Sequence, residues 1–169
     1  MLLIGSLTLI GGCGALGLWI AHKIRSRPQE IREFIVALTL LDTEILYNST
    51  PLPEAFANIS LRMKEPWQSF FRALKHRIEN GEGAGEAWEN TIASHKKHTN
   101  LKEDDWQIIA SLGKGLGRSD RQEQHKHITL ILHQLELACE QSAKWADNNA
   151  RMWSYLGFLT GTGLVILLI

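Results

Sequence analysis

Residues 28–47 read PQEIREFIVALTLLDTEILY, and this stretch decides the fold class. Its apolar side chains recur at alternating intervals of three and four residues, at Ile31, Phe34, Leu38, Leu41 and Ile45. That spacing is the period of an α-helix with one buried face. Proline suits the first turn of a helix, because it has no N–H to donate. The stretch therefore predicts a helix from about Pro28 to Tyr47, whose apolar face Val36 and Leu40 broaden.

The segments that follow also indicate helices, because none shows the alternating pattern of a strand bounded by turn residues. We expect helices over about 53–62, 66–80, 85–99 and 103–112, and one long helix from about 119 to the C-terminus. Glycine-rich turns separate them at 81–85 and 113–117. The expected fold class is all-α, with a cytoplasmic bundle of about six helices between N- and C-terminal transmembrane helices.

The charges are confined to the middle of the chain. Of 169 residues, 18 are Lys or Arg and 18 are Asp or Glu, and all of them lie between Lys23 and Arg151. The uncharged end segments approach the roughly 20 apolar residues that a membrane helix needs. Basic residues flank both segments on the side of the middle domain, which the positive-inside rule assigns to the cytoplasm. We therefore expect a transmembrane helix at 1–21, a cytoplasmic helical domain at 22–152 and a transmembrane helix at 153–169, with both termini outside.

Composition excludes several classes of function. The net charge of zero gives no field that would attract nucleic acid. The two cysteines, Cys13 and Cys139, imply no disulfide framework. Only two segments are long enough to span a membrane, so a polytopic transporter is excluded. Gly157 and Gly161 have the spacing that lets membrane helices pack closely, although glycine is also common in such helices generally.

No motif supports catalysis, a cofactor or a metal. His125 and His127 are two residues apart and point in different directions on a helix, so we expect solvated surface histidines. The glycines of 113–117 lack the spacing and the Ser or Thr of a phosphate-binding loop. No nucleophile and base are brought together by sequence. We expect a protein that is not an enzyme.

Two charged stretches are candidate contact surfaces. Arg72 and Lys75 belong to a basic stretch, and Glu86 and Glu89 belong to an acidic series that shares a helical face. Charge runs are commonly solvated helix surfaces. The alternative is electrostatic docking of a cytoplasmic partner.

Short motifs along nearly the whole chain resemble those of the stage III sporulation protein AB family of endospore-forming bacteria. They are PQEIR at 28–32, LDTEILY at 41–47, TPLPEA at 50–55, Ala87-Trp88, Leu112-Gly113, LGRSD at 116–120, Gln124, YLG at 155–157 and GTGLVILLI at 161–169. Each motif is weak singly, but their order is specific.

This resemblance implies a component of the membrane complex that joins the mother cell to the forespore, anchored in the mother-cell membrane around the forespore. The cytoplasmic domain is similar to the helical domain of F-type platform proteins in type II secretion. Those platforms work beside a cytoplasmic ATPase, here one like stage III sporulation protein AA. Other membrane components of the complex are further expected partners. Secretion platforms usually repeat the helical domain, and one copy here leaves homo-oligomerisation open.

The candidate interface residues are the turn residues Gly113, Leu116, Gly117, Ser119 and Asp120. Glycines in this turn either allow a backbone conformation with positive φ or allow a partner to approach the backbone closely. Glu44 is a further candidate, because a carboxylate beside the apolar face must be paired or lie at an edge. The rival hypothesis is a membrane-anchored sensor or regulator that binds a ligand. A platform should show complementary charged patches, whereas a sensor should show a concave apolar site with convergent polar groups.

Overall fold

The computed structural model describes the backbone of residues 2–48, 50–117 and 121–168. Within these ranges the chain forms α-helices, one π-helix and one 3-10 helix, and no strand. The elements are α1 (Leu2–Thr43), η1 (the π-helix Glu44–Asn48), α2 (Leu52–Arg62), α3 (Trp67–Glu79), α4 (Ala84–His95), η2 (the 3-10 helix Lys96–His98), α5 (Glu103–Gly113) and α6 (Arg121–Leu168). The expected all-α class is confirmed.

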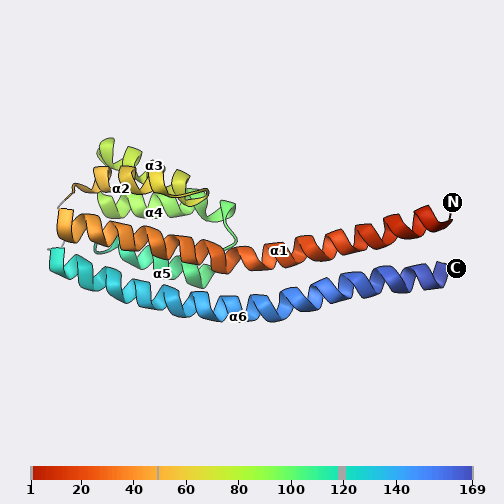
Figure 1. The fold of residues 1–169 in the computed structure, drawn as a ribbon. Coiled ribbons are helices and arrows are strands. Elements are labelled where there is room, and N and C mark those ends of the chain that lie inside the picture. The colour runs from red at the N-terminus through yellow and green to blue at the C-terminus, as the bar shows by residue number, and fades with distance from the viewer. Residues whose placement is uncertain (1, 49, 118–120, 169) are drawn as a thin grey trace. The chain divides into compact units, whose positions relative to one another are not determined.

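The chain divides into two compact units. One comprises Met1–Pro28 with Glu140–Ile169, and the other comprises Gln29–Cys139. Within the second unit, α2 packs against α3, α3 against α4 and α4 against α5. Figure 1 shows these short helices gathered along the C-terminal part of α1. The second unit contains the hydrophobic core and every candidate interface residue that the structure describes.

The apolar face predicted for residues 28–47 is confirmed, but the helix does not begin at Pro28. Pro28 lies inside α1, which begins at Leu2. Proline lacks a backbone donor and its ring crowds the carbonyl four residues earlier, but α1 continues through this position. The expectation that Val36 broadens the buried face is wrong, because its side chain is 51% exposed.

Aromatic side chains fill the core of the second unit. The ring of Phe34 on α1 lies 4.5 Å from that of Trp67 and 6.1 Å from that of Phe71, both on α3. Trp88 of α4 packs edge-on against Phe70 with 5.4 Å between ring centroids. All five side chains are fully buried. Pairs in this geometry add to the energy of burial, so the cluster joins α1, α3 and α4 into one body.

Hydrogen bonds join α1 to α3 and to the segment before α5. The indole Nε1 of Trp67 donates to the backbone carbonyl of Glu30 at 2.9 Å. The Glu30 carboxylate accepts hydrogen bonds from the backbone N and the side-chain Nδ2 of Asn100, at 2.8 and 2.7 Å. Burial raises the pKa of Glu30, against the opposing effect of the Asn100 hydrogen bonds. The segment before α5 is therefore fastened to α1 near Gln29, where the second unit begins.

The expected membrane segments stay predictions. Among the residues that the structure describes, no helix combines the length and the apolar character needed to cross a membrane. The side chains of residues 1–18 and of most residues in 153–169 lie outside the described part, and the expected segments fall largely there.

The Trp67 hydrogen bond can be tested against a matched tryptophan. Trp106 is also buried, but its Nε1 has no hydrogen-bond partner. Both Trp67→Phe and Trp106→Phe remove the same atoms, whereas only Trp67→Phe also removes a hydrogen bond, the one to the partly buried Glu30 carbonyl. We expect Trp67→Phe to lower the free energy of unfolding by about 1 kcal/mol more than Trp106→Phe does. Urea unfolding followed by near-UV circular dichroism measures both, and an equal or larger loss for Trp106→Phe would contradict the assignment.

Candidate functional site: the glycine end of the bundle

Gly113 is the last residue of α5, and it lies against a core tryptophan. A Cβ added to Gly113 would lie 2.8 Å from Cδ1 of Trp88. The Nε1 of Trp88 donates to the carbonyl of Ile109, also on α5, at 2.9 Å. A side chain at position 113 would therefore collide with a ring that is held in place. This glycine serves the packing of α4 against α5.

The two glycine-rich segments meet at one end of the bundle. A Cβ on Gly85 of α4 would lie 3.0 Å from the carbonyl oxygen of Gly113. Gly117 has a φ of +74°, which favours glycine, and its backbone lies beside Leu52 and Ala84. Leu52 and Ala84 are the first residues of α2 and α4. The turn after α5 thus lies against the N-termini of two helices.

Glu44 closes the neighbouring turn. Its carboxylate accepts hydrogen bonds from Thr50 Oγ1 at 2.7 Å and from Asn48 Nδ2 at 3.1 Å. Its backbone carbonyl accepts a further one from the N–H of Thr50 at 3.2 Å. The hydrogen bonds from Thr50 and then Asn48 lower the pKa of Glu44 below its ordinary value, and Arg62 contributes in the same direction. Of the two expected arrangements, the structure has the Glu44 carboxylate hydrogen-bonded, and its partners Asn48 and Thr50 lie on the path from η1 to α2. Its role at an interface stays a prediction.

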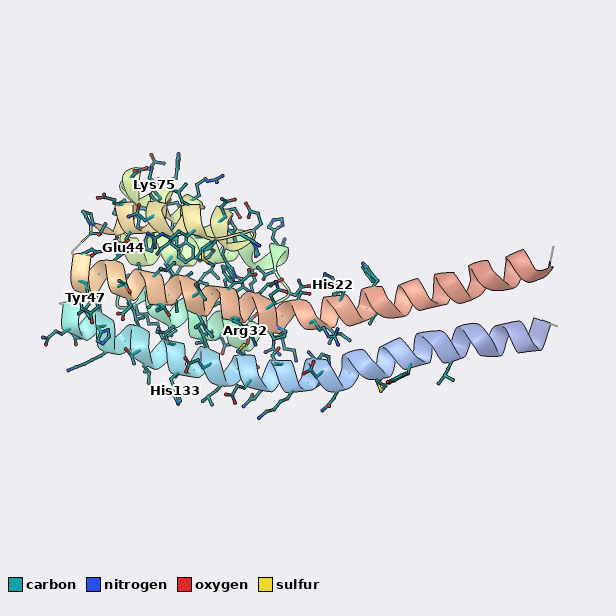
Figure 2. The ribbon with its side chains drawn as sticks, in the orientation of Figure 1. His22, Arg32, Glu44, Tyr47, Lys75 and His133 are labelled. Carbon is teal, nitrogen blue, oxygen red and sulfur yellow. The ribbon has the colours of Figure 1, made fainter. Side chains whose placement is uncertain are left out.

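These elements form one surface, which we call the glycine end. It consists of η1, the first turns of α2 and α4, and the turn after α5. Figure 2 shows Glu44 and Tyr47 at the C-terminal end of α1, on this surface. Of the sequence-predicted candidates, Glu44, Glu86 and Gly117 lie on this surface, whereas Gly113 and Leu116 are buried behind it. Ser119 and Asp120, the remaining candidates of the turn, lie outside the described residues.

The charged stretches are partly paired within themselves. Lys75 contacts Glu79 at 3.0 Å, and Arg77 contacts Glu82 at 2.9 Å. These pairs reduce the charge that the C-terminal part of α3 offers to a partner. Arg72 on α3, and Glu86 and Glu89 on α4, are exposed. Arg72, Lys75 and Glu89 lie outside the glycine end as defined here.

The expectation of solvated histidines is wrong for two positions on α6. Nδ1 of His125 lies 2.8 Å from a carboxylate oxygen of Asp42 on α1. Nε2 of His127 lies 3.0 Å from the carbonyl oxygen of Ser111 on α5. Both rings are half-buried because α6 packs along these helices. Among the described residues, no group of His, Cys, Asp or Glu is arranged to hold a metal ion.

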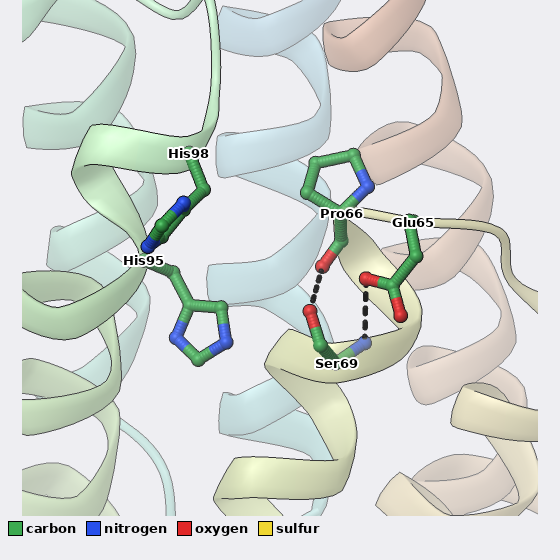
Figure 3. Close-up of a pocket in the computed structure, with 5 residues that line it drawn as sticks. All are labelled: Glu65, Pro66, Ser69, His95 and His98. Atoms are coloured by element: carbon green, nitrogen blue, oxygen red, sulfur yellow. Dashed lines mark hydrogen bonds between the residues drawn. The ribbon is translucent and has the colours of Figure 1, made fainter.

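A separate open pocket lies between the N-terminal turn of α3 and the end of α4. It has a volume of about 540 Å³ and is lined by Glu65, Pro66, Ser69, His95 and His98. Figure 3 shows the two imidazoles on one side and the other residues facing them. Several polar groups are already occupied: Ser69 donates through Oγ to the Pro66 carbonyl, and His95 Nδ1 contacts the Thr91 carbonyl.

Sequence reasoning missed Tyr47 and the π-helix. Tyr47 was placed at the end of the first buried helix, but its side chain is 76% exposed. A π-helix depends on where the chain must turn toward α2, and no local residue pattern encodes it. Pro51 and Pro53 indicate a turn in this part of the sequence, but they do not indicate that a π-helix precedes it.

Gly113→Ala tests the role of the glycine in packing. The added methyl must displace the ring of Trp88, so we expect a loss of about 1–3 kcal/mol in the free energy of unfolding. Gly83→Ala is the matched control, because nothing lies within 4 Å of a Cβ at that position. We expect that control to cost less than about 1 kcal/mol by chemical unfolding. A Gly113→Ala protein as stable as the wild type would refute the packing role.

Thr50→Val tests the Glu44 turn through its dependence on pH. A carboxyl whose pKa is lowered by folding stabilises the protein above its ordinary pKa of 4.5, and this contribution disappears as pH falls through the folded value. We therefore expect Thr50→Val to destabilise the protein at pH 7, and the difference from wild type to shrink below about pH 4.5. Thr43→Val is the control, because Thr43 donates to the Thr39 carbonyl rather than to a carboxylate. Unfolding measured from pH 3 to 7 should show a pH-independent effect for the control; the same profile for both variants would argue against the Glu44 interaction.

Comparisons with known proteins agree on one family. A model of the family described as stage III sporulation protein AB matches residues 2–169. The protein of that name from Bacillus subtilis (strain 168) is 33% identical over 168 residues, which cover 98% of each chain. A solved structure titled stage III sporulation protein AB matches with a TM-score of 0.68 and 30% identity, and covers 72% of this chain and 96% of the solved one. The chain therefore belongs to the stage III sporulation protein AB family.

Proposed function

We propose that this protein is a membrane-anchored platform in a secretion-like complex between mother cell and forespore, and that it docks a cytoplasmic ATPase without catalysis of its own. Membership of the family supports a role in sporulation. The uncharged runs at both ends, with basic residues on their inner sides, support membrane anchoring with the middle domain in the cytoplasm. The similarity to secretion platforms supports an ATPase like stage III sporulation protein AA as the partner.

The observation that carries the docking role is the glycine end itself. It joins elements from four parts of the chain, and two of them are held by specific contacts. Trp88 and Gly113 hold the turn after α5, and Thr50 and Asn48 hold η1 through Glu44. Stable interfaces need such preorganised surfaces, because ordering loops on binding costs affinity.

The sensor hypothesis has one observation in its favour, the pocket between α3 and α4. Its volume of about 540 Å³ is within the range of small-molecule sites. Such sites are mostly enclosed and apolar, whereas this pocket is open and its polar side chains largely bond to their own helices. We therefore prefer the platform to the sensor.

Capture of the ATPase tests the proposal. The full-length protein, solubilised in mild detergent and immobilised, is mixed with the purified stage III sporulation protein AA-like ATPase at about 50 mM and about 500 mM salt. We expect capture that weakens at the higher salt, because exposed charges are screened there. An unrelated cytoplasmic ATPase serves as the control. Absence of capture at both salt concentrations, with and without nucleotide, would contradict docking, and ligand-dependent protection of the α3–α4 pocket would then favour the sensor.

A further inference from the structure

The part of α6 within the first unit exposes a regular stripe of uncharged side chains. The stripe consists of exposed residues at alternating intervals of four and three: Gln141, Trp145, Asn148, Met152, Tyr155 and Leu159. At 3.6 residues per turn these positions fall within an arc of about 80°. The alternation is the a/d pattern of a coiled coil, in which two helices meet along one such stripe. We call these six residues the outer seam.

The packing of α6 within its own unit uses a different face. Ser142 and Ala146 of the same stretch are buried, and the helical period places them on the other side of α6. On the outer seam, Trp145 is 52% exposed and Tyr155 is 69% exposed. Single exposed apolar side chains are ordinary on protein surfaces. Four of them on one stripe, however, form a patch of the kind that marks an interaction site.

Two amide side chains in the outer seam indicate a second copy of the chain as its partner. Gln141 and Asn148 each carry donors and an acceptor on one group, so such an amide can pair with an identical amide across a two-fold axis. Buried amides at such positions fix the register of coiled-coil helices. A purely aliphatic partner, such as a lipid chain, would bury the amides without hydrogen bonds. The outer seam is therefore self-complementary when identical residues meet.

The charges beside the outer seam favour a parallel pair. Lys144 and Arg151 occupy one flank of the seam in the sequence, and Asn149 occupies the other. In a parallel pair, the flank of one helix meets the opposite flank of its partner, so Lys144 lies opposite Asn149. In an antiparallel pair, identical flanks meet, and cations would face each other. A parallel pair therefore avoids a like-charge contact.

We propose that the outer seam binds the outer seam of a second copy of this chain, with the two α6 helices parallel and in register. This inference rests on the membrane anchoring in the proposed function, because copies anchored in one membrane with the same topology have parallel α6 helices. The outer seam runs from the charged stretch before Met152 into the uncharged run after it. A second copy presents the same sequence of polar and apolar positions at the same depth.

Cysteine cross-linking tests this pairing in membranes that contain the full-length protein. Cys13→Ser and Cys139→Ala remove the native thiols, and one new cysteine is then introduced. Asn148→Cys places the thiol in the outer seam. Asp147→Cys is the matched control, because this exposed position lies about 100° away around the helix. Mild oxidation is followed by electrophoresis without reductant.

We expect Asn148→Cys to yield at least about five times more cross-linked dimer than Asp147→Cys, because a disulfide requires Cβ atoms within about 4.5 Å of each other. The product should have twice the mass of the 19.1 kDa chain. A product of another mass would identify a different protein on the outer seam and overturn the inference. Equal yields from the two variants, or no dimer from either, would overturn it as well.

A charge in the outer seam tests the same contact without oxidation. Trp145→Lys places identical cations opposite each other, so energy transfer between differently labelled copies in lipid vesicles should fall about fivefold or more. Leu61→Lys is the control, because Leu61 is 80% exposed on α2 and lies outside the seam. Circular dichroism confirms that each variant is folded. If the Trp145→Lys copies associate as strongly as the wild type does, the contact lies elsewhere and the inference is wrong.

The outcomes separate this inference from the proposed function. Cross-linking through Asn148→Cys without capture of the ATPase would support the pairing and refute docking. Capture of the ATPase without cross-linking would support docking and refute the pairing. Release of the protein from membranes at high pH would remove the anchoring that orients the copies, and both would fail.

Discussion

The packing of Phe34 against Trp67 is the contact on which the second unit depends. It brings α1 onto α3 with 4.5 Å between ring centroids, and the Trp67 indole then donates to the Glu30 carbonyl one turn earlier on α1. The Glu30 carboxylate in turn accepts two hydrogen bonds from Asn100, in the segment before α5. One aromatic pair and its hydrogen bonds therefore set the positions of three segments that are far apart in sequence. The short helices need this contact and the other buried side chains of α1 as a common surface, because helices of this length are marginal alone.

The core also determines the form of the glycine end. Trp88 is buried against Phe70 on one side, and on the other it meets α5 through the Ile109 carbonyl and Gly113. Its ring thereby connects the aromatic cluster to the turn after α5. A glycine at position 113 is the condition for this contact, so the conformation of the turn is a consequence of core packing.

The helices and the buried face of α1 could be predicted because they follow from local periodicity. Ile31, Phe34, Leu38, Leu41 and Ile45 are all buried, as their spacing indicates. Features that depend on a distant partner could not be predicted. Pro28 reads as a helix start until the preceding segment is seen to be helical, and His125 reads as a surface residue until α6 lies beside Asp42. Tyr47 belongs to the same class, since its exposure follows from the turn that Glu44 and Thr50 close.

A docking role places a mechanical demand on the fold that catalysis does not. A load applied at the glycine end must reach α1 through packed side chains, because the connections there are short turns. Under the proposed docking role, two contacts would transmit this load: Trp88 joins the turn after α5 to the aromatic cluster, and Phe34 joins the cluster to α1, with 6.4 Å between the two ring centroids. From Thr43 back to Gln29, α1 then extends about 21 Å as continuous helix at 1.5 Å per residue. Close-packed interiors have low compressibility, so a partner held at the glycine end would be coupled to α1 with little loss of position.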